Sequence, residues 1–188
     1  FKPILGDLGI NICKIKTLDI QSSFKNFDKN YLISKEIEKT PNGTSHFWVK
    51  DPYENIFQVI ESDNWFSKNT SDTGGVFGAI IGVTDIEKSI HFYKTILGYD
   101  TIDWQGEGNF DDLSALNPNK HQFKRAILSH SKNRKGSFSQ LLGTSQIELV
   151  QNLTENGKNI YKDRFWGDLG FIHLCFDIIG MEALREEC

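Results

Sequence analysis

The sequence has few cysteines and no long apolar run among its 188 residues. Its three cysteines, Cys13, Cys175 and Cys188, are an odd number and widely spaced, which excludes a disulfide framework and a zinc site built from cysteines. No apolar run approaches the roughly 20 residues that a membrane helix needs. We therefore expect no membrane partner and a location in the reducing cytoplasm.

Basic charge is also scarce. Lys and Arg number 21 against 25 Asp and Glu, which gives a net charge of -4. A general nucleic-acid binder needs a basic surface for phosphate contacts, so we expect no nucleic-acid partner. Hydrophobic residues make up 38% of the chain, which is enough for a packed core.

One strand–helix–strand pattern stands out in residues 76–152. An apolar run over 76–83 predicts a buried strand. Thr84 and Glu87 form a capping-box pattern, which predicts the start of a helix that ends at Gly98. Further strands are predicted over 99–104, 122–129 and 145–151. In the last of these, Ile147 and Leu149 alternate with Glu148, so we expect Glu148 to face away from the helix.

The same order appears earlier in the chain. The pattern predicts a strand over 9–16, a helix over 18–27 and strands over 31–37, 46–50 and 56–61. At the other end, residues 171–178 predict a strand and residues 181–188 the start of a helix. We interpret the chain as βαβββ modules over 1–62 and 76–152, linkers over 63–75 and 153–169, and the start of a third module over 170–188.

A short repeat supports this division. Gly6-Asp7-Leu8-Gly9 recurs as Gly167-Asp168-Leu169-Gly170, and each copy precedes a predicted strand. On this interpretation the chain starts and stops partway through the repeat. Module 1–62 would then pair with a module before Phe1, and module 76–152 with the one that begins at residue 170.

Several segments resemble the vicinal oxygen chelate superfamily, which includes glyoxalase I, bleomycin-resistance proteins, methylmalonyl-CoA epimerase and extradiol dioxygenases. Residues 80–93, followed by Leu97-Gly98, are similar to its opening strand and helix. Asp51-Pro52-Tyr53-Glu54-Asn55 and the strand after it look like its final hairpin. The resemblance implies an α+β fold in which tandem βαβββ modules form curved mixed sheets around a cleft for a small molecule.

The resemblance also implies a divalent metal held from the first and last strands of each module. The corresponding residues here are Glu148, as a metal ligand and catalytic group, and His173, as a second ligand. Imidazole and carboxylate suit Zn, Ni, Fe, Mn or Co. The remaining first-strand position holds Gly78, and the earlier module has Ile10 or Asn11 and Gln58, which are poor ligand pairs.

Two functions follow from these residues. The first is a metal-dependent lyase or isomerase of the glyoxalase or epimerase kind. The second is a small-molecule binding protein, like the bleomycin-resistance proteins, that keeps the cleft and has lost the metal. Gly78, Gly82 and Gln146 are predicted to line the substrate pocket, although the two glycines could instead relieve packing. A cleft completed by a second copy of the chain would make a homodimer.

A group of basic residues surrounds the predicted strand over 122–129. The simplest interpretation is that these residues form a solvated surface, and the alternative is that they steer an anionic substrate. Its members are Lys120, Lys124, Arg125, Lys132, Arg134 and Lys135.

Overall fold

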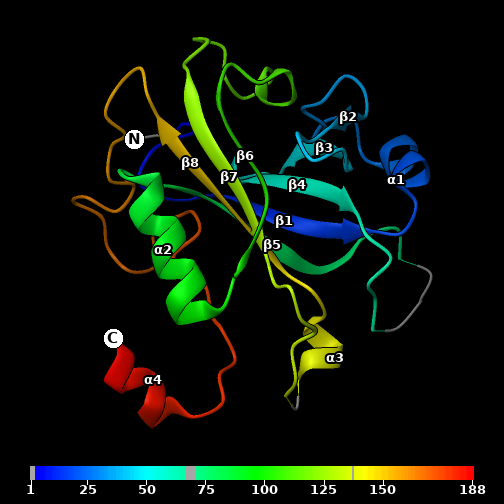
Figure 1. Ribbon diagram of the computed structural model, residues 1–188. Coiled ribbons are helices and arrows are strands. Elements are labelled where there is room, and N and C mark those ends of the chain that lie inside the picture. Colours follow the sequence, from blue (N-terminus) through cyan, green and yellow to red (C-terminus); the bar gives the residue numbers. More distant parts are fainter. Residues whose placement is uncertain (1–2, 67–70, 137) are drawn as a thin grey trace.

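The computed structural model describes residues 3–66, 71–136 and 138–188, and within them two successive units have the same order of elements (Figure 1). The first unit consists of β1 (Gly9–Thr17), α1 (Ile20–Asn26), β2 (Glu38–Lys39), β3 (Ser45–Lys50) and β4 (Ile56–Glu61). The second consists of β5 (Gly74–Gly82), α2 (Ile86–Leu97), β6 (Thr101–Gly108), β7 (Phe123–Ser129) and β8 (Gln146–Asn152). Three short helices complete the described structure: η1 (Asp111–Leu113), α3 (Ser139–Leu142) and α4 (Met181–Glu187).

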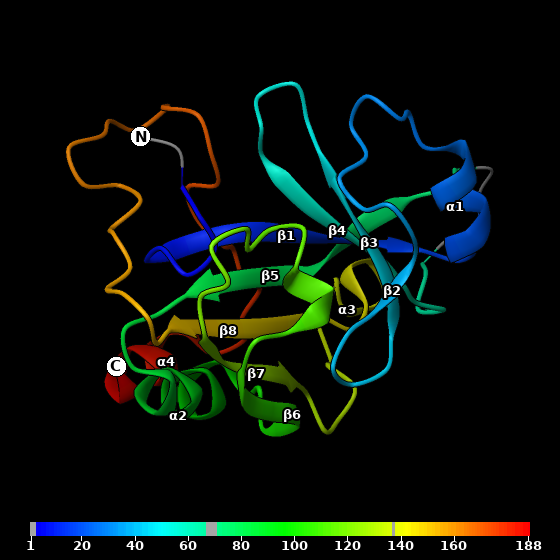
Figure 2. The same ribbon diagram turned by 90° about the horizontal axis from the view of Figure 1, so that it is seen from above.

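The eight strands form one curled mixed sheet in the order β2-β3-β4-β1-β5-β8-β7-β6 (Figures 1 and 2). In each unit the first strand lies parallel to the last strand, β1 to β4 and β5 to β8. The two units meet at the antiparallel pair β1 and β5. The sequence led us to expect each module to pair with one outside the chain or at its end, but here the two modules pair with each other because their first strands hydrogen-bond directly.

The two helices α1 and α2 cover one face of the sheet. Ile86 and Ile90 of α2 pack against Ile147 and Leu149 of β8, while Ile20 of α1 packs in a cluster of its own with β3 and β4. This confirms the predicted alternation of β8. Glu148 therefore points to the opposite face, away from α2.

The cap of α2 differs from the predicted one by a single residue. The side chain of Asp85, not of Thr84, accepts a hydrogen bond from the backbone N–H of Lys88, so the helix begins one residue later. Gly98 ends the helix with a left-handed backbone, as predicted, with a φ of 69°.

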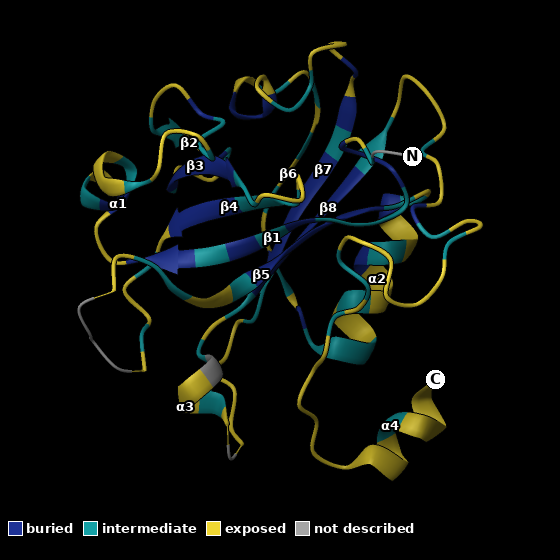
Figure 3. Cartoon of the chain, turned by 180° about the vertical axis from the view of Figure 1, so that it is seen from behind, coloured by how far each residue is buried: buried dark blue, intermediate teal, exposed yellow. Residues whose placement is uncertain are grey.

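Two predicted strands are replaced by irregular chain. Over 31–37, the chain meets β3 at an isolated bridge between Leu32 and Val49, and the hydroxyl of Ser34 accepts a hydrogen bond from the backbone N–H of Trp48, so only β2 pairs regularly with β3. Over 171–178, the chain is irregular and pairs with no described strand, and much of it is exposed (Figure 3). The helix predicted after it is present as α4. No helix within the described residues is long and apolar enough to cross a membrane.

Candidate functional site

A buried charge network occupies the face of the sheet opposite α1 and α2. Glu148 on β8 is fully buried, and Oε2 accepts a hydrogen bond from Nζ of Lys14 on β1 at 2.7 Å. Its Oε1 accepts from Nε and Nη2 of Arg125 on β7, at 2.9 and 2.6 Å. Both carboxylate oxygens are thus bound by cations that come from the two different units.

The network extends from Arg125 to the short helix η1 and the chain around it. Its guanidinium donates two parallel hydrogen bonds to the carboxylate of Asp112, at 2.8 and 2.9 Å. Trp48 on β3 fixes the same segment, because its indole N–H donates to the carbonyl of Asp112 at 2.8 Å. Arg125, assigned to a solvated surface from the sequence, is fully buried. The two carboxylates balance Lys14 and Arg125 in charge.

The electrostatics of Glu148 follow from these partners. Burial would raise its pKa, but the charges of Arg125 and Lys14 outweigh burial and lower the pKa to about 2. Glu148 is therefore an ionised carboxylate near neutral pH. Burial lowers the pKa of Lys14, and the neighbouring Glu148 opposes that shift.

Two polar side chains on the same face lack hydrogen bonds. His46 on β3 and Gln58 on β4 are fully buried, and none of their side-chain nitrogen and oxygen atoms has a partner among the described residues. Burial lowers the pKa of His46 to about 3, so its imidazole is neutral. The ring packs edge-on against Trp48, with centroids 4.8 Å apart.

The donor set around Glu148 does not fit a divalent metal. An ammonium and a guanidinium have no lone pair to offer, while a catalytic metal usually takes three protein ligands. Within residues 3–66, 71–136 and 138–188, no group of three His, Cys, Asp or Glu side chains could hold a metal ion.

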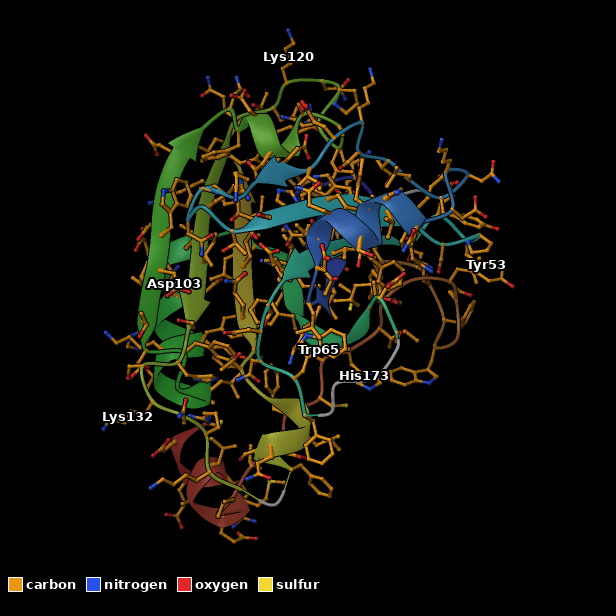
Figure 4. The ribbon with its side chains drawn as sticks, turned by 90° about the vertical axis from the view of Figure 1, so that its right-hand side faces the viewer. Tyr53, Trp65, Asp103, Lys120, Lys132 and His173 are labelled. Carbon is orange, nitrogen blue, oxygen red and sulfur yellow. The ribbon has the colours of Figure 1, made fainter. Side chains whose placement is uncertain are left out.

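His173 lies apart from Glu148. Its segment is not a strand, its side chain is exposed, and its ring stacks on Trp166 with centroids 5.5 Å apart (Figure 4). Among the described contacts none joins His173 to Glu148. The expected pairing depended on a strand over 171–178, and without that strand the alternation of residues does not direct His173 toward the sheet.

Gly78 and Gly82 permit close contact between backbones. A Cβ at Gly78 would lie 1.7 Å from the carbonyl oxygen of Gln146, and one at Gly82 would lie 1.9 Å from that of Asp7. Both glycines thus occupy tight packing positions in place of the open space that the sequence led us to expect for a ligand.

Gln146 connects the charge network to a pocket of about 620 Å³. Its side-chain oxygen accepts a hydrogen bond from Lys14 Nζ at 2.5 Å, and the residue also lines the pocket. The other walls come from β5, β6 and β7, the chain after β4, the chain after β7 and the chain before β8. Figure 4 marks Trp65, Asp103 and Lys132, which line this pocket from different elements.

Sequence reasoning found Glu148 and Gln146 but missed their partners. One feature of the sequence indicates that Lys14 is buried. It lies on the same face of its strand as the apolar Ile12, where a solvent-exposed lysine would be unusual. Arg125 likewise shares one face of its strand with the apolar residues Phe123 and Ile127. Asp112 lies in a polar segment, and nothing in its sequence context marks it.

The comparisons with known proteins identify the fold. No protein-family model matches the sequence, and no curated protein sequence matches it. A "putative dioxygenase" from Bacillus subtilis matches with a TM-score of 0.50 and 14% identity, over 84% of this chain and 44% of that one. Glyoxalase I from Zea mays matches with a TM-score of 0.46 and 19% identity, over 78% and 44%. Methylmalonyl-CoA epimerase from Streptomyces coelicolor matches with a TM-score of 0.36 and 11% identity, over 78% and 98%.

This chain spans less than half the length of the Bacillus subtilis and Zea mays proteins. At these identities the likeness concerns the fold and not the activity. The order of elements, the curled sheet of two βαβββ units and the match to the Bacillus subtilis protein agree. The chain therefore has the fold of the vicinal oxygen chelate superfamily.

Proposed function

We propose that this chain binds a small molecule in its cleft without a divalent metal. The observation that carries the proposal is the occupation of both Glu148 oxygens by Lys14 and Arg125. A metal at Glu148 would have to displace a buried cation, which would leave that cation without a counter-charge in a dry environment. Glu148 thus supports the structure of the cleft instead of holding a Lewis acid.

The pocket beside Gln146 supports the binding part of the proposal. Its volume of about 620 Å³ lies within the range of small-molecule sites, roughly 300–1,000 Å³. Three aromatic side chains, Trp65, Phe66 and Phe77, line it beside a larger number of polar and charged ones, which suits a ligand that carries both a ring and a polar group. The alternative, a metal-dependent lyase or isomerase that uses Glu148 and His173, would require a rearrangement that brings these residues together.

A thermal-shift screen of small organic compounds tests the proposal. We expect at least one compound whose stabilisation of the chain is the same with and without a chelator. Exposed His173→Ala serves as a control and should leave that stabilisation unchanged. Stabilisation or turnover that appears only with added Zn²⁺, Mn²⁺ or Ni²⁺, and is lost in His173→Ala, would contradict the proposal and favour the lyase or isomerase.

Two further expectations belong to this proposal. A homodimer is testable by the solution mass of the purified chain, although the two units of a single chain already form one continuous sheet. A cytoplasmic location is supported by the three cysteines, all of which are free thiols.

A further inference from the structure

The pocket beside Gln146 has an aromatic wall whose orientation is fixed. Trp65 donates its indole N–H to the carbonyl of Ser62 at 2.9 Å. Its ring covers Gly74, where a Cβ would lie only 2.8 Å from the ring. Phe77 of β5 adds a second aromatic ring to the lining. These two aromatic side chains in one lining, one of them an indole held by a hydrogen bond, are suited to pack against a flat apolar ligand.

The wall formed by the chain after β7 is cationic. Lys132 and Arg134 line the pocket, both are exposed, and neither forms a hydrogen bond or ion pair with any of the described residues. Among the described residues that line the pocket Asp103 is the one carboxylate, and it accepts a hydrogen bond from Ser129 at 2.8 Å. The buried ammonium of Lys16 lies behind the lining residue Gly143, 3.0 Å from where a Cβ would be. Positive charge therefore exceeds negative charge around the pocket.

Gln146 supplies a directed hydrogen-bond donor. Because Lys14 already donates to its Oε1, the amide is oriented and its NH₂ group remains available. Gln146 lines the pocket, and its amide nitrogen is not a buried atom without a partner, as expected for a donor that is accessible from the pocket. A donor of this kind favours a ligand that carries an acceptor, such as a carboxylate oxygen.

From these three walls we infer that the pocket binds a small, flat aromatic carboxylate. The ring packs against Trp65 and Phe77, and the carboxylate lies toward Lys132 and Arg134, within reach of the amide of Gln146. This inference rests on the proposed metal-free binding function and names its ligand class. The charge makes the affinity depend on ionic strength, because the two cations are exposed to solvent.

Calorimetric titration with naphthoate and naphthamide tests the inference, since the two probes share a ring system and differ in charge. We expect naphthoate to bind about tenfold more tightly than naphthamide at low salt, a ratio that corresponds to two exposed charge contacts. Lys132→Ala combined with Arg134→Ala should remove that difference. The control, Lys94→Ala combined with Lys135→Ala, removes the same charge outside the pocket lining and should leave it unchanged.

Equal affinity for the two probes, no binding of naphthoate, or an unchanged ratio in the Lys132 and Arg134 variant would overturn the inference. The proposed function fails differently. It fails if the thermal-shift screen yields only metal-dependent hits, and it survives if a neutral compound binds in the presence of chelator while naphthoate does not.

Discussion

The ammonium of Lys14 and a carboxylate oxygen of Glu148 lie 2.7 Å apart in the centre of the sheet, although 134 residues separate them in the sequence. Lys14 lies on the first strand of one unit and Glu148 on the last strand of the other. Because both side chains are fully buried, the pair joins the two units electrostatically as well as through the backbone of β1 and β5. This pairing makes the centre of the sheet a charge-balanced structural element.

Removal of either Lys14 or Glu148 alone should destabilise the folded chain. Lys14→Met leaves Glu148 buried with Arg125 alone, and we expect the free energy of unfolding to fall by about 3 kcal/mol or more. Adding Glu148→Gln should recover part of the loss, because Arg125 and Asp112 then balance each other and no excess negative charge is buried. Urea unfolding measures both effects. The surface pair Lys50–Glu54 is the matched control, and Lys50→Met should cost less than about 1 kcal/mol.

Additive effects of Lys14→Met and Glu148→Gln would contradict this prediction, because residues that form an energetically coupled pair give non-additive changes.

The stability of the chain should fall as the pH is lowered from 7 to 5, in part because of His46. Burial lowers the pKa of His46 from 6.5 to about 3, so the unfolded chain takes up a proton below about pH 6.5 while the folded chain does not. This contribution to stability is present above pH 6.5 and is lost toward pH 3, on the order of 1 kcal/mol per pH unit. Urea unfolding at pH 7 and pH 5 measures it.

His46→Phe should reduce the difference between the two pH values, and His91→Gln, at an exposed position on α2, should not. The contribution of Glu148 to stability changes over a lower pH range. Its pKa is lowered from 4.5 to about 2, so its contribution is present above pH 4.5 and is lost only as the pH falls toward 2. An unchanged pH dependence in His46→Phe would show that this imidazole is not buried in its neutral form.

Gly78→Ala should disrupt the contact between β5 and β8. The new methyl group would lie 1.7 Å from the carbonyl oxygen of Gln146, which is a backbone atom that cannot rotate away. We expect a loss of about 3 kcal/mol in the free energy of unfolding. Gly136→Ala, where the nearest atom is a flexible side chain 3.3 Å away, should change it by less than about 0.5 kcal/mol. A Gly78→Ala protein of normal stability would instead favour open space at this position.

Much of the fold could be predicted from local patterns. The alternation of Ile147, Glu148 and Leu149 assigned each side chain to the correct face, because helix packing makes one face of β8 apolar. Gly98 was correctly predicted to end α2, since its backbone conformation is left-handed. The strand over 171–178 was wrong, because alternation defines faces but cannot supply a hydrogen-bonding partner.

The site was harder to predict because it depends on register between strands. Lys14 and Arg125 are ordinary cations in the sequence, and their burial follows only when β1, β5, β8 and β7 lie side by side. The pairs Lys14–Gly78 and Gly78–Gln146 then bring Lys14 to β8 across a strand that has no side chain at this point. That explains why a glycine, a lysine and a glutamate that are distant in sequence form one structure.

The metal content of the purified chain tests the central claim most directly. If Lys14 and Arg125 occupy the coordination sites of Glu148, elemental analysis after dialysis against a mixture of Zn²⁺, Ni²⁺, Mn²⁺, Fe²⁺ and Co²⁺ should find well below one metal ion per chain. Glu148→Gln should give the same low value. Near-stoichiometric metal that is lost in both Glu148→Gln and His173→Ala would contradict a metal-free cleft.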